Sequence, residues 1–293
     1  MELKLSRFIW GQWRLLDWNL SYTEREKLTR EVIDLGISSI DHADIYGDYS
    51  CEAAFGEVLK NNPSWRSEMQ LISKCGIKLI SDRYPNRKVK YYDYSYDYIV
   101  GQAENSLHNL NTDILDLLLL HRPSPFFNAE EVASAFDYLY QSGKVKSFGV
   151  SNFLPHQFEQ LAKASDHDLV SNQIELSIYS LEHFENQNIN FLQSKGVNPM
   201  AWSPLAGGKI LSPDDEKSKR VQKGLYKIQE KYPDFSIDQI ALAWLLMHPA
   251  GIQPILGSGK LKHIKSAIAA QEIQLSLEDW FYLYTCSTGQ EVP

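Results

Sequence analysis

Four polar side chains follow short apolar runs, at points where the chain leaves a predicted strand. Asp41, Lys74 and His121 each close such a run, and Tyr46 follows Asp41 by five residues. A tyrosine hydroxyl, with an ordinary pKa of about 10, is a suitable proton donor to an alkoxide if a nearby cation lowers that value. Lys74 can supply the cation, Asp41 can hold the lysine, and His121 can donate a hydrogen bond to a carbonyl oxygen. The set favours a proton-delivery unit for carbonyl reduction.

Each of the four residues, taken alone, also has a structural explanation. A strand-end aspartate often caps the next turn, a lysine there is usually a solvated charge, and the chain has 16 tyrosines. A single titratable group is therefore weak grounds for a site. The catalytic interpretation depends on all four lying together at one end of a sheet.

Short apolar runs alternate along the whole chain with segments of helical periodicity. Eight such β-then-α units favour a parallel sheet closed into a (β/α)8 TIM barrel, with extra peripheral helices and a single domain over 1–293. A capping box at Thr23 and Glu26 is expected to open the first helix, and the stretch 76–93 is expected to be a long, polar, tyrosine-rich connection. The predicted strands are 6–10, 38–41, 70–74, 114–121, 145–150, 169–175, 199–203 and 252–256.

A doubly wound sheet is the rival fold. A dinucleotide enzyme of that class would carry a G-x-G-x-x-G turn after the first strand. The turn here reads Gly11-Gln12-Trp13-Arg14, which lacks that pattern. The barrel is therefore the preferred fold, and its active site is expected at the carboxyl ends of the strands.

Composition excludes several classes of protein. The 293 residues are 43% hydrophobic and 23% charged with a net charge of −8, and no basic block marks a nucleic-acid or membrane partner. Three scattered cysteines lack metal or disulfide spacing, so no metal is expected. The first residues show no signal-peptide pattern, and the longest apolar run, near 115–120, is too short for a bilayer. We expect a cytoplasmic protein.

Five ordered motifs resemble those of the aldo-keto reductase superfamily. They cover nearly the whole chain, and the closest likeness is to an uncharacterised bacterial oxidoreductase branch. The motifs are Asp41-His42-Ala43-Asp44-Ile45-Tyr46-Gly47, Ser73-Lys74-Cys75-Gly76, the strand from Asp113 to Pro123 with His121, Gly149-Val150-Ser151-Asn152-Phe153, and Asn172-Gln173-Ile174-Glu175.

The resemblance implies reduction of aldehyde or ketone carbonyls by hydride transfer from NADPH, with Tyr46 as general acid and NADP+ as the other product. It also implies a cofactor site made without a Rossmann fold. His263 stands where many relatives carry arginine, which weakens the expected preference for the 2′-phosphate. By the same resemblance, Ser151, Asn152 and Gln173 hold the carboxamide, Trp202 stacks on the nicotinamide, Ser203 to Leu205 follow the pyrophosphate, and Ser258, Lys260 and His263 lie at the 2′-phosphate.

The substrate side is less defined by the sequence. Trp13, Tyr49 and Arg122 are candidate contacts to a small carbonyl substrate whose identity stays open, as does the oligomeric state. One alternative is a regulatory subunit that binds the cofactor with little turnover, as some relatives do. A second is a barrel lyase that uses Lys74 as a Schiff-base amine.

Overall fold

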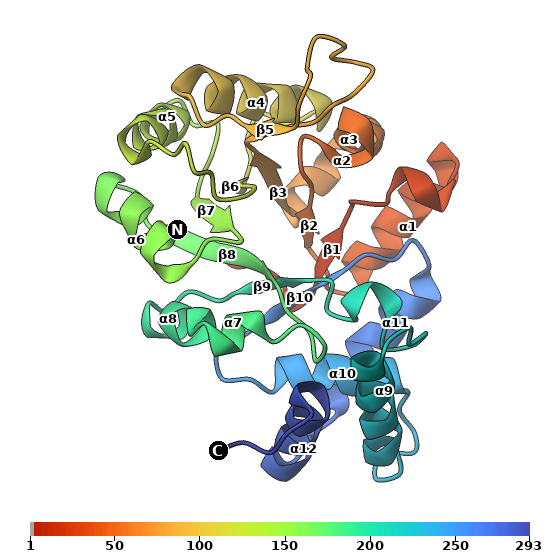
Figure 1. Cartoon of the computed structure of the whole chain (residues 1–293). Coiled ribbons are helices and arrows are strands. Elements are labelled where there is room, and N and C mark those ends of the chain that lie inside the picture. Colours follow the sequence, from red (N-terminus) through yellow and green to blue (C-terminus); the bar gives the residue numbers. More distant parts are fainter. Residues whose placement is uncertain (1–2) are drawn as a thin grey trace. The chain divides into compact units, whose positions relative to one another are not determined.

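Eight parallel strands form a closed barrel in the computed structural model, which describes residues 3–293 (Figure 1). Their order around the barrel is β1-β10-β9-β8-β7-β6-β3-β2, which confirms the predicted (β/α)8 fold. Met1 and Glu2, on which the signal-peptide expectation partly rests, lie outside the described residues. The strands are β1 (Ile9–Gly11), β2 (Ser39–Asp41), β3 (Gln70–Cys75), β6 (Leu117–Leu120), β7 (Phe148–Ser151), β8 (Leu169–Glu175), β9 (Met200–Trp202) and β10 (Gln253–Leu256).

The chain divides into two compact units. The first unit comprises Met1–Asn172 with Gly257–Gly259, and the second comprises Gln173–Leu256 with Lys260–Pro293. The prediction of one domain over 1–293 stays a prediction.

In the first unit, helices follow the strands β1, β2, β3, β6 and β7. All residues of these strands except Gln70 are buried, and all four residues of β6 are fully buried, as expected for a parallel sheet covered by helices. The helices of this unit are η1 (Leu16–Trp18), α1 (Tyr22–Asp34), α2 (Tyr46–Tyr49), α3 (Cys51–Asn61), η2 (Pro63–Glu68), α4 (Tyr96–Asn109), α5 (Ala129–Gln141) and α6 (Pro155–Ala164).

Helix α1 begins two residues earlier than predicted. Its capping box is formed by Ser21, whose backbone N–H donates to Glu24 Oε2 at 2.8 Å while its own hydroxyl accepts from the Glu24 N–H. Glu26, which the sequence placed in the box, instead accepts hydrogen bonds at 2.6 Å from both Tyr22 and Asn62. The expected box at Thr23 and Glu26 was wrong, because Glu26 binds Tyr22 one turn earlier in the helix and the distant Asn62 instead.

The long connection predicted over 76–93 contains two short strands, and they flank residues 79–90, which form neither helix nor strand. Strands β4 (Ile77–Lys78) and β5 (Tyr91–Tyr92) pair in antiparallel fashion, and Lys78 forms an ion pair with Asp93. At the tip, the Arg87 guanidinium lies 3.7 Å from the centre of the Tyr84 ring. These cation–π and ionic contacts order a segment whose polar composition gave no sign of structure.

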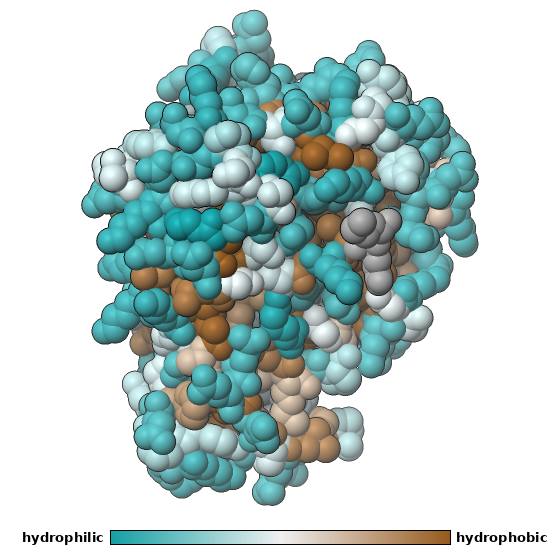
Figure 2. Space-filling model, turned by 180° about the vertical axis from the view of Figure 1, so that it is seen from behind, coloured by the Kyte–Doolittle hydropathy of each residue, from teal (hydrophilic) through white to brown (hydrophobic). Residues whose placement is uncertain are grey.

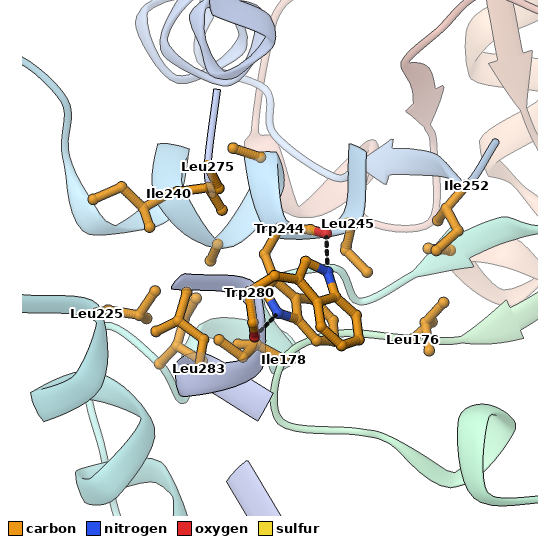
Figure 3. Packing of buried hydrophobic residues seen from close by; sticks show 14 of the residues in the cluster. Leu176, Ile178, Leu225, Ile240, Trp244, Leu245, Ile252, Leu275, Trp280 and Leu283 are labelled. Carbon is orange, nitrogen blue, oxygen red and sulfur yellow. Dashed lines mark hydrogen bonds between the residues drawn. The ribbon is translucent and has the colours of Figure 1, made fainter. Parts of the chain in front are cut away.

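The second unit packs its helices around a pair of tryptophans. The rings of Trp244 on α10 and Trp280 on α12 are stacked with centroids 4.6 Å apart, and each indole N–H donates to the other residue's backbone carbonyl at 3.0 Å (Figure 3). This exchange satisfies both buried indole N–H groups. The helices are α7 (Glu182–Glu185), α8 (Asn188–Ser194), η3 (Ala206–Gly208), α9 (Glu216–Gln229), α10 (Ile237–Leu246), α11 (Leu261–Ala269), η4 (Ala270–Glu272) and α12 (Leu277–Thr288).

Hydrophilic side chains predominate on the face drawn in Figure 2, and hydrophobic ones gather there in separate patches. Within residues 3–293, no helix combines the length and the apolar character needed to cross a bilayer.

Candidate active site

Three neighbouring strands of the first unit end at one place. In the parallel pairing, Asp41 of β2 lies opposite Ile72 of β3, and Lys74 of β3 lies opposite Leu119 of β6. The chain beyond β2 continues along β3, because the Asp44 N–H donates to the Lys74 carbonyl at 3.0 Å. The ends of β2, β3 and β6 therefore bring their polar residues together.

Lys74 is completely buried and its ammonium is fully hydrogen-bonded. Nζ lies 2.8 Å from both carboxylate oxygens of Asp41, 2.7 Å from the His42 carbonyl oxygen and 2.9 Å from the Tyr46 hydroxyl oxygen. Burial opposes the charge, but Asp41 and Tyr46 outweigh it and raise the pKa of Lys74. The Lys74 side chain is therefore a cation held in a fixed position at the Tyr46 hydroxyl.

Tyr46 owes its position to the sharp turn that follows it. Gly47 has φ +56°, and Asp48 and Tyr49 are also in the left-handed region, so the chain reverses at once into α3. A Cβ on Gly47 would lie 2.6 Å from Cys51 Sγ, which excludes other residues there. The turn leaves Tyr46 half-buried, with its hydroxyl at the Lys74 ammonium.

His121 faces Tyr46 across the end of β6. Their rings meet edge to face at 78° with centroids 5.9 Å apart. Burial, followed by the charges of Lys74, Arg122 and Lys90, lowers the pKa of His121 well below its usual value. His121 is therefore a neutral imidazole beside the tyrosine hydroxyl.

The pKa of Tyr46 differs in direction from the sequence expectation. Lys74 does act to lower it, but burial is the larger effect and raises the pKa above its ordinary value. The phenol consequently stays protonated at neutral pH, which suits a proton donor. The structure thus brings Asp41, Tyr46, Lys74 and His121 together, as the sequence predicted.

Residues 7–287 match the family model described as the Aldo/keto reductase family. The chain belongs to this family of oxidoreductases. It is 45% identical over 292 residues to the uncharacterized oxidoreductase YcsN of Bacillus subtilis, a match that covers 100% of this chain and 97% of that protein. These findings confirm both the resemblance and the bacterial branch that the motifs indicated.

Two further relatives are informative. The 6-dehydroglucose reductase of Agrobacterium fabrum is 40% identical over 292 residues, covering 99% of this chain and 97% of that protein. An aldo/keto reductase from Klebsiella pneumoniae, solved in complex with NADP and acetate, aligns with a TM-score of 0.75 at 24% identity, covering 95% of this chain and 90% of that one. The structural likeness supports the barrel fold of this reductase.

Three predicted cofactor residues of the reductase lie in the first unit. Ser151 is the buried last residue of β7, and it accepts a hydrogen bond at 2.7 Å from the Asn152 amide. Asn152 itself has φ +61°, so the chain turns directly at the strand end. The Ser258 carbonyl accepts a hydrogen bond from the Trp10 indole at 3.0 Å, which fixes the segment 257–259 on β1.

The other predicted cofactor residues lie in the second unit. Gln173 is buried in β8, and Trp202 is the half-buried last residue of β9. Ser203 has φ +51° and starts the connection to η3, where Leu205 packs on the apolar core. Lys260 and His263 are both exposed, the first at the N-cap of α11 and the second in its first turn.

The predicted substrate residues differ in their surroundings. Trp13 is 61% exposed after β1, whereas Arg122 is half-buried directly after His121. The Tyr49 hydroxyl accepts hydrogen bonds from the Leu79 N–H at 2.9 Å and from Arg87 at 2.8 Å. Tyr49 thus ties the hairpin 76–93 to the turn that carries Tyr46, and a substrate contact for these three residues stays a prediction.

Two buried acids behind the site were not identified from the sequence. Glu52 of α3 accepts a hydrogen bond from the Ser73 hydroxyl at 2.5 Å, and burial raises its pKa. Asp44 is 5% exposed, and its pKa is raised well above the usual value by burial and by Glu52. Glu52 could have been found, since it shares a helical face with Phe55 and Leu59.

Proposed function

We propose that this reductase converts aldehyde or ketone carbonyls to alcohols, with NADPH as the hydride donor and Tyr46 as the general acid. The contact between Lys74 Nζ and the Tyr46 hydroxyl oxygen carries the proposal. An ammonium group has no acceptor, so Tyr46 accepts this hydrogen bond with its oxygen. The phenolic proton is left available for a substrate oxygen.

NADPH, when bound, supplies the hydride that reaches the carbonyl carbon. The carbonyl oxygen gains negative charge at that moment, and Tyr46 transfers its proton to it. The phenolate that remains is stabilised by the Lys74 ammonium at 2.9 Å, and Asp41 holds this ammonium with both carboxylate oxygens. Asp41 therefore acts through Lys74.

His121 has a separate task in this proposal. A neutral imidazole can donate one N–H to the carbonyl oxygen and so orient it toward Tyr46. An imidazolium could compete with Tyr46 as the acid, and the lowered pKa of His121 prevents this. Tyr46 thus delivers the proton, and His121 orients the carbonyl.

The residues of the second unit suit a phosphate-bearing cofactor. Helix α11 begins without a side-chain cap and has no acidic residue in its first turn. Such an N-terminus favours an anion, and Lys260 and Lys262 add two cations to it. The 2′-phosphate of NADPH fits this donor set. With it we propose Ser258 and His263 at the same phosphate, Ser151, Asn152 and Gln173 for the carboxamide, Trp202 for the nicotinamide ring, and Ser203 and Leu205 along the pyrophosphate.

The proposal is tested by measuring NADPH oxidation over a panel of aldehydes and ketones, with formation of the alcohol confirmed by mass spectrometry. The panel should include 6-dehydroglucose, because the Agrobacterium fabrum relative bears that substrate in its name. We expect turnover with at least one aldehyde. Binding of NADPH without turnover on any carbonyl would contradict the proposal and favour the regulatory alternative.

The Schiff-base alternative requires an approachable and unprotonated amine. Lys74 is 0% exposed and donates to Asp41, His42 and Tyr46, so its lone pair is not available. Trapping of a carbonyl substrate on Lys74 by borohydride is therefore expected to fail.

Preference for NADPH over NADH should depend on Lys260. The Lys260→Ala variant is expected to bind NADPH about 10-fold more weakly and NADH unchanged, because one charge-assisted contact from an exposed lysine to phosphate contributes about 1.5 kcal/mol. Tryptophan fluorescence quenching measures both affinities. Lys195→Ala, at the exposed C-cap of α8, is the control. Equal weakening of NADPH and NADH would show that Lys260 does not contact the phosphate.

The rate of carbonyl reduction should be independent of pH between about 6 and 9. His121, with its lowered pKa, is already neutral throughout this range. Tyr46 and Lys74, with raised pKa values, stay protonated throughout it. A kcat profile measured in constant-ionic-strength buffers checks this, and a slope within the window would mean that one of the three titrates there.

A further inference from the structure

Tyr94 is a buried tyrosine at the point where the hairpin 76–93 leads into α4. The tip of the hairpin is exposed, but Tyr94 is only 5% exposed. It contacts the backbone of Gly76, two residues after Lys74, and of Arg122, directly after His121. A role for Tyr94 in catalysis rests on the function proposed above for His121.

The Tyr94 hydroxyl is hydrogen-bonded to the backbone of Arg122, the residue that follows His121. It accepts a hydrogen bond from the Arg122 N–H at 3.0 Å and donates one to the Arg122 carbonyl at 2.5 Å. Burial raises the pKa of this phenol well above its ordinary value, so the hydroxyl keeps its proton and keeps both bonds. The two bonds fix the peptide groups on either side of Arg122, the first of which belongs to His121.

The Tyr94 ring contacts the end of β3 as well. A Cβ on Gly76 would lie 2.0 Å from a carbon of this ring, and Gly76 has φ +113°, so only glycine fits beneath it. The two strand ends are joined directly, because the His121 N–H donates to the Cys75 carbonyl at 2.9 Å. Tyr94 thus braces the backbone next to both Lys74 and His121.

The His121 ring lacks the support that usually orients a catalytic imidazole. Such a ring is commonly held by a hydrogen bond at its second nitrogen. Here Nδ1 is buried and has no hydrogen-bond partner within residues 3–293. The orientation of the His121 ring therefore depends on the position of its backbone and on packing. The hydroxyl of Tyr94 holds this backbone by hydrogen bonds to Arg122.

We propose that Tyr94 is a positioning residue that sets the His121 imidazole against the substrate carbonyl. By fixing the backbone at Arg122, Tyr94 restrains the His121 ring in place of a direct hydrogen bond to Nδ1. A misplacement of about 1 Å in a catalytic group costs about 100-fold in rate. Loss of the two hydrogen bonds of the Tyr94 hydroxyl is therefore expected to lower kcat, although Tyr94 itself does not touch the substrate.

The test is a double-mutant cycle between Tyr94→Phe and His121→Ala, read as single-turnover reduction rates at high enzyme concentration. Tyr94→Phe alone should lower the rate about 10-fold to 100-fold, with NADPH affinity and the far-ultraviolet circular dichroism spectrum unchanged. In the His121→Ala background the same change should have no further effect. A merely structural role would lower the rate equally in both backgrounds, and that result would overturn the inference.

Tyr98→Phe is the matched control. The Tyr98 hydroxyl donates to the Ile77 carbonyl at 3.4 Å and so anchors the same hairpin away from β6. This variant should leave the rate within about 2-fold of the wild type, and an equal loss would show that loosening the hairpin alone is sufficient. Tyr46→Phe is measured in parallel. If Tyr46→Phe leaves turnover unchanged, the proposed function fails. If Tyr46→Phe loses turnover but Tyr94→Phe and His121→Ala show no coupling, only the role of Tyr94 is refuted.

Discussion

Replacement of Tyr46 by phenylalanine is expected to remove carbonyl reduction almost completely, lowering kcat by about 1,000-fold. The variant keeps the ring that packs edge to face on His121 and loses only the hydroxyl that receives the Lys74 hydrogen bond. No proton is then available where the alkoxide forms. The measurement is steady-state NADPH oxidation with the best aldehyde of the panel.

Cofactor affinity distinguishes a chemical effect from a folding defect. NADPH should bind Tyr46→Phe about as tightly as the wild type, because the residues proposed to hold the cofactor are unchanged. Tyr140→Phe, on the exposed face of α5, is a control that should keep full activity. A Tyr46→Phe enzyme with kcat within about 2-fold of wild type would disprove the assignment of the acid.

Replacement of Lys74 by methionine is expected to destabilise the protein as well as to inactivate it. Asp41 is 3% exposed as a side chain and would lose the cation that both of its carboxylate oxygens contact. Removing one partner of a buried ion pair costs about 3–5 kcal/mol in the free energy of unfolding. Urea unfolding followed by circular dichroism should show this loss, and kcat should fall as far as in Tyr46→Phe.

The double variant Lys74→Met with Asp41→Leu separates the two effects. Replacing both members of a buried pair by apolar residues is often neutral for stability, so most of the lost unfolding free energy should return. Activity should not return, because Tyr46 still lacks its cation. Recovery of turnover along with stability would mean that Lys74 has only a structural role.

The barrel could be predicted because its signals are local. Each strand is a short apolar run, such as Leu117–Leu120, and each is followed by a helix with its own start and stop residues. The two short strands within the connection 76–93 were missed for the opposite reason. The order of this connection comes from contacts made across the fold, such as Arg87 with Tyr49, and no periodicity along the chain encodes them.

The four residues of the candidate site were found from their positions at strand ends together with the family motifs. The raised pKa of Tyr46 could not be foreseen, because the degree of burial decides whether it outweighs Lys74. Tyr94 was also missed, since nothing in the sequence distinguishes it from the other 15 of the 16 tyrosines. Its significance depends on Gly76 and Arg122 being brought to it by folding.

The stacked indoles of Trp244 and Trp280 have an optical consequence. Two aromatic chromophores whose centroids lie 4.6 Å apart couple their electronic transitions, which produces a paired circular dichroism signal that neither ring gives alone. Since one ring belongs to α10 and the other to α12, the contribution of this pair is lost when the last helix undocks from the second unit, whereas that of the stacked Trp10 and Trp18 remains (Figure 3). The chain thus carries an intrinsic gauge of local opening at its C-terminal helix, readable without a label.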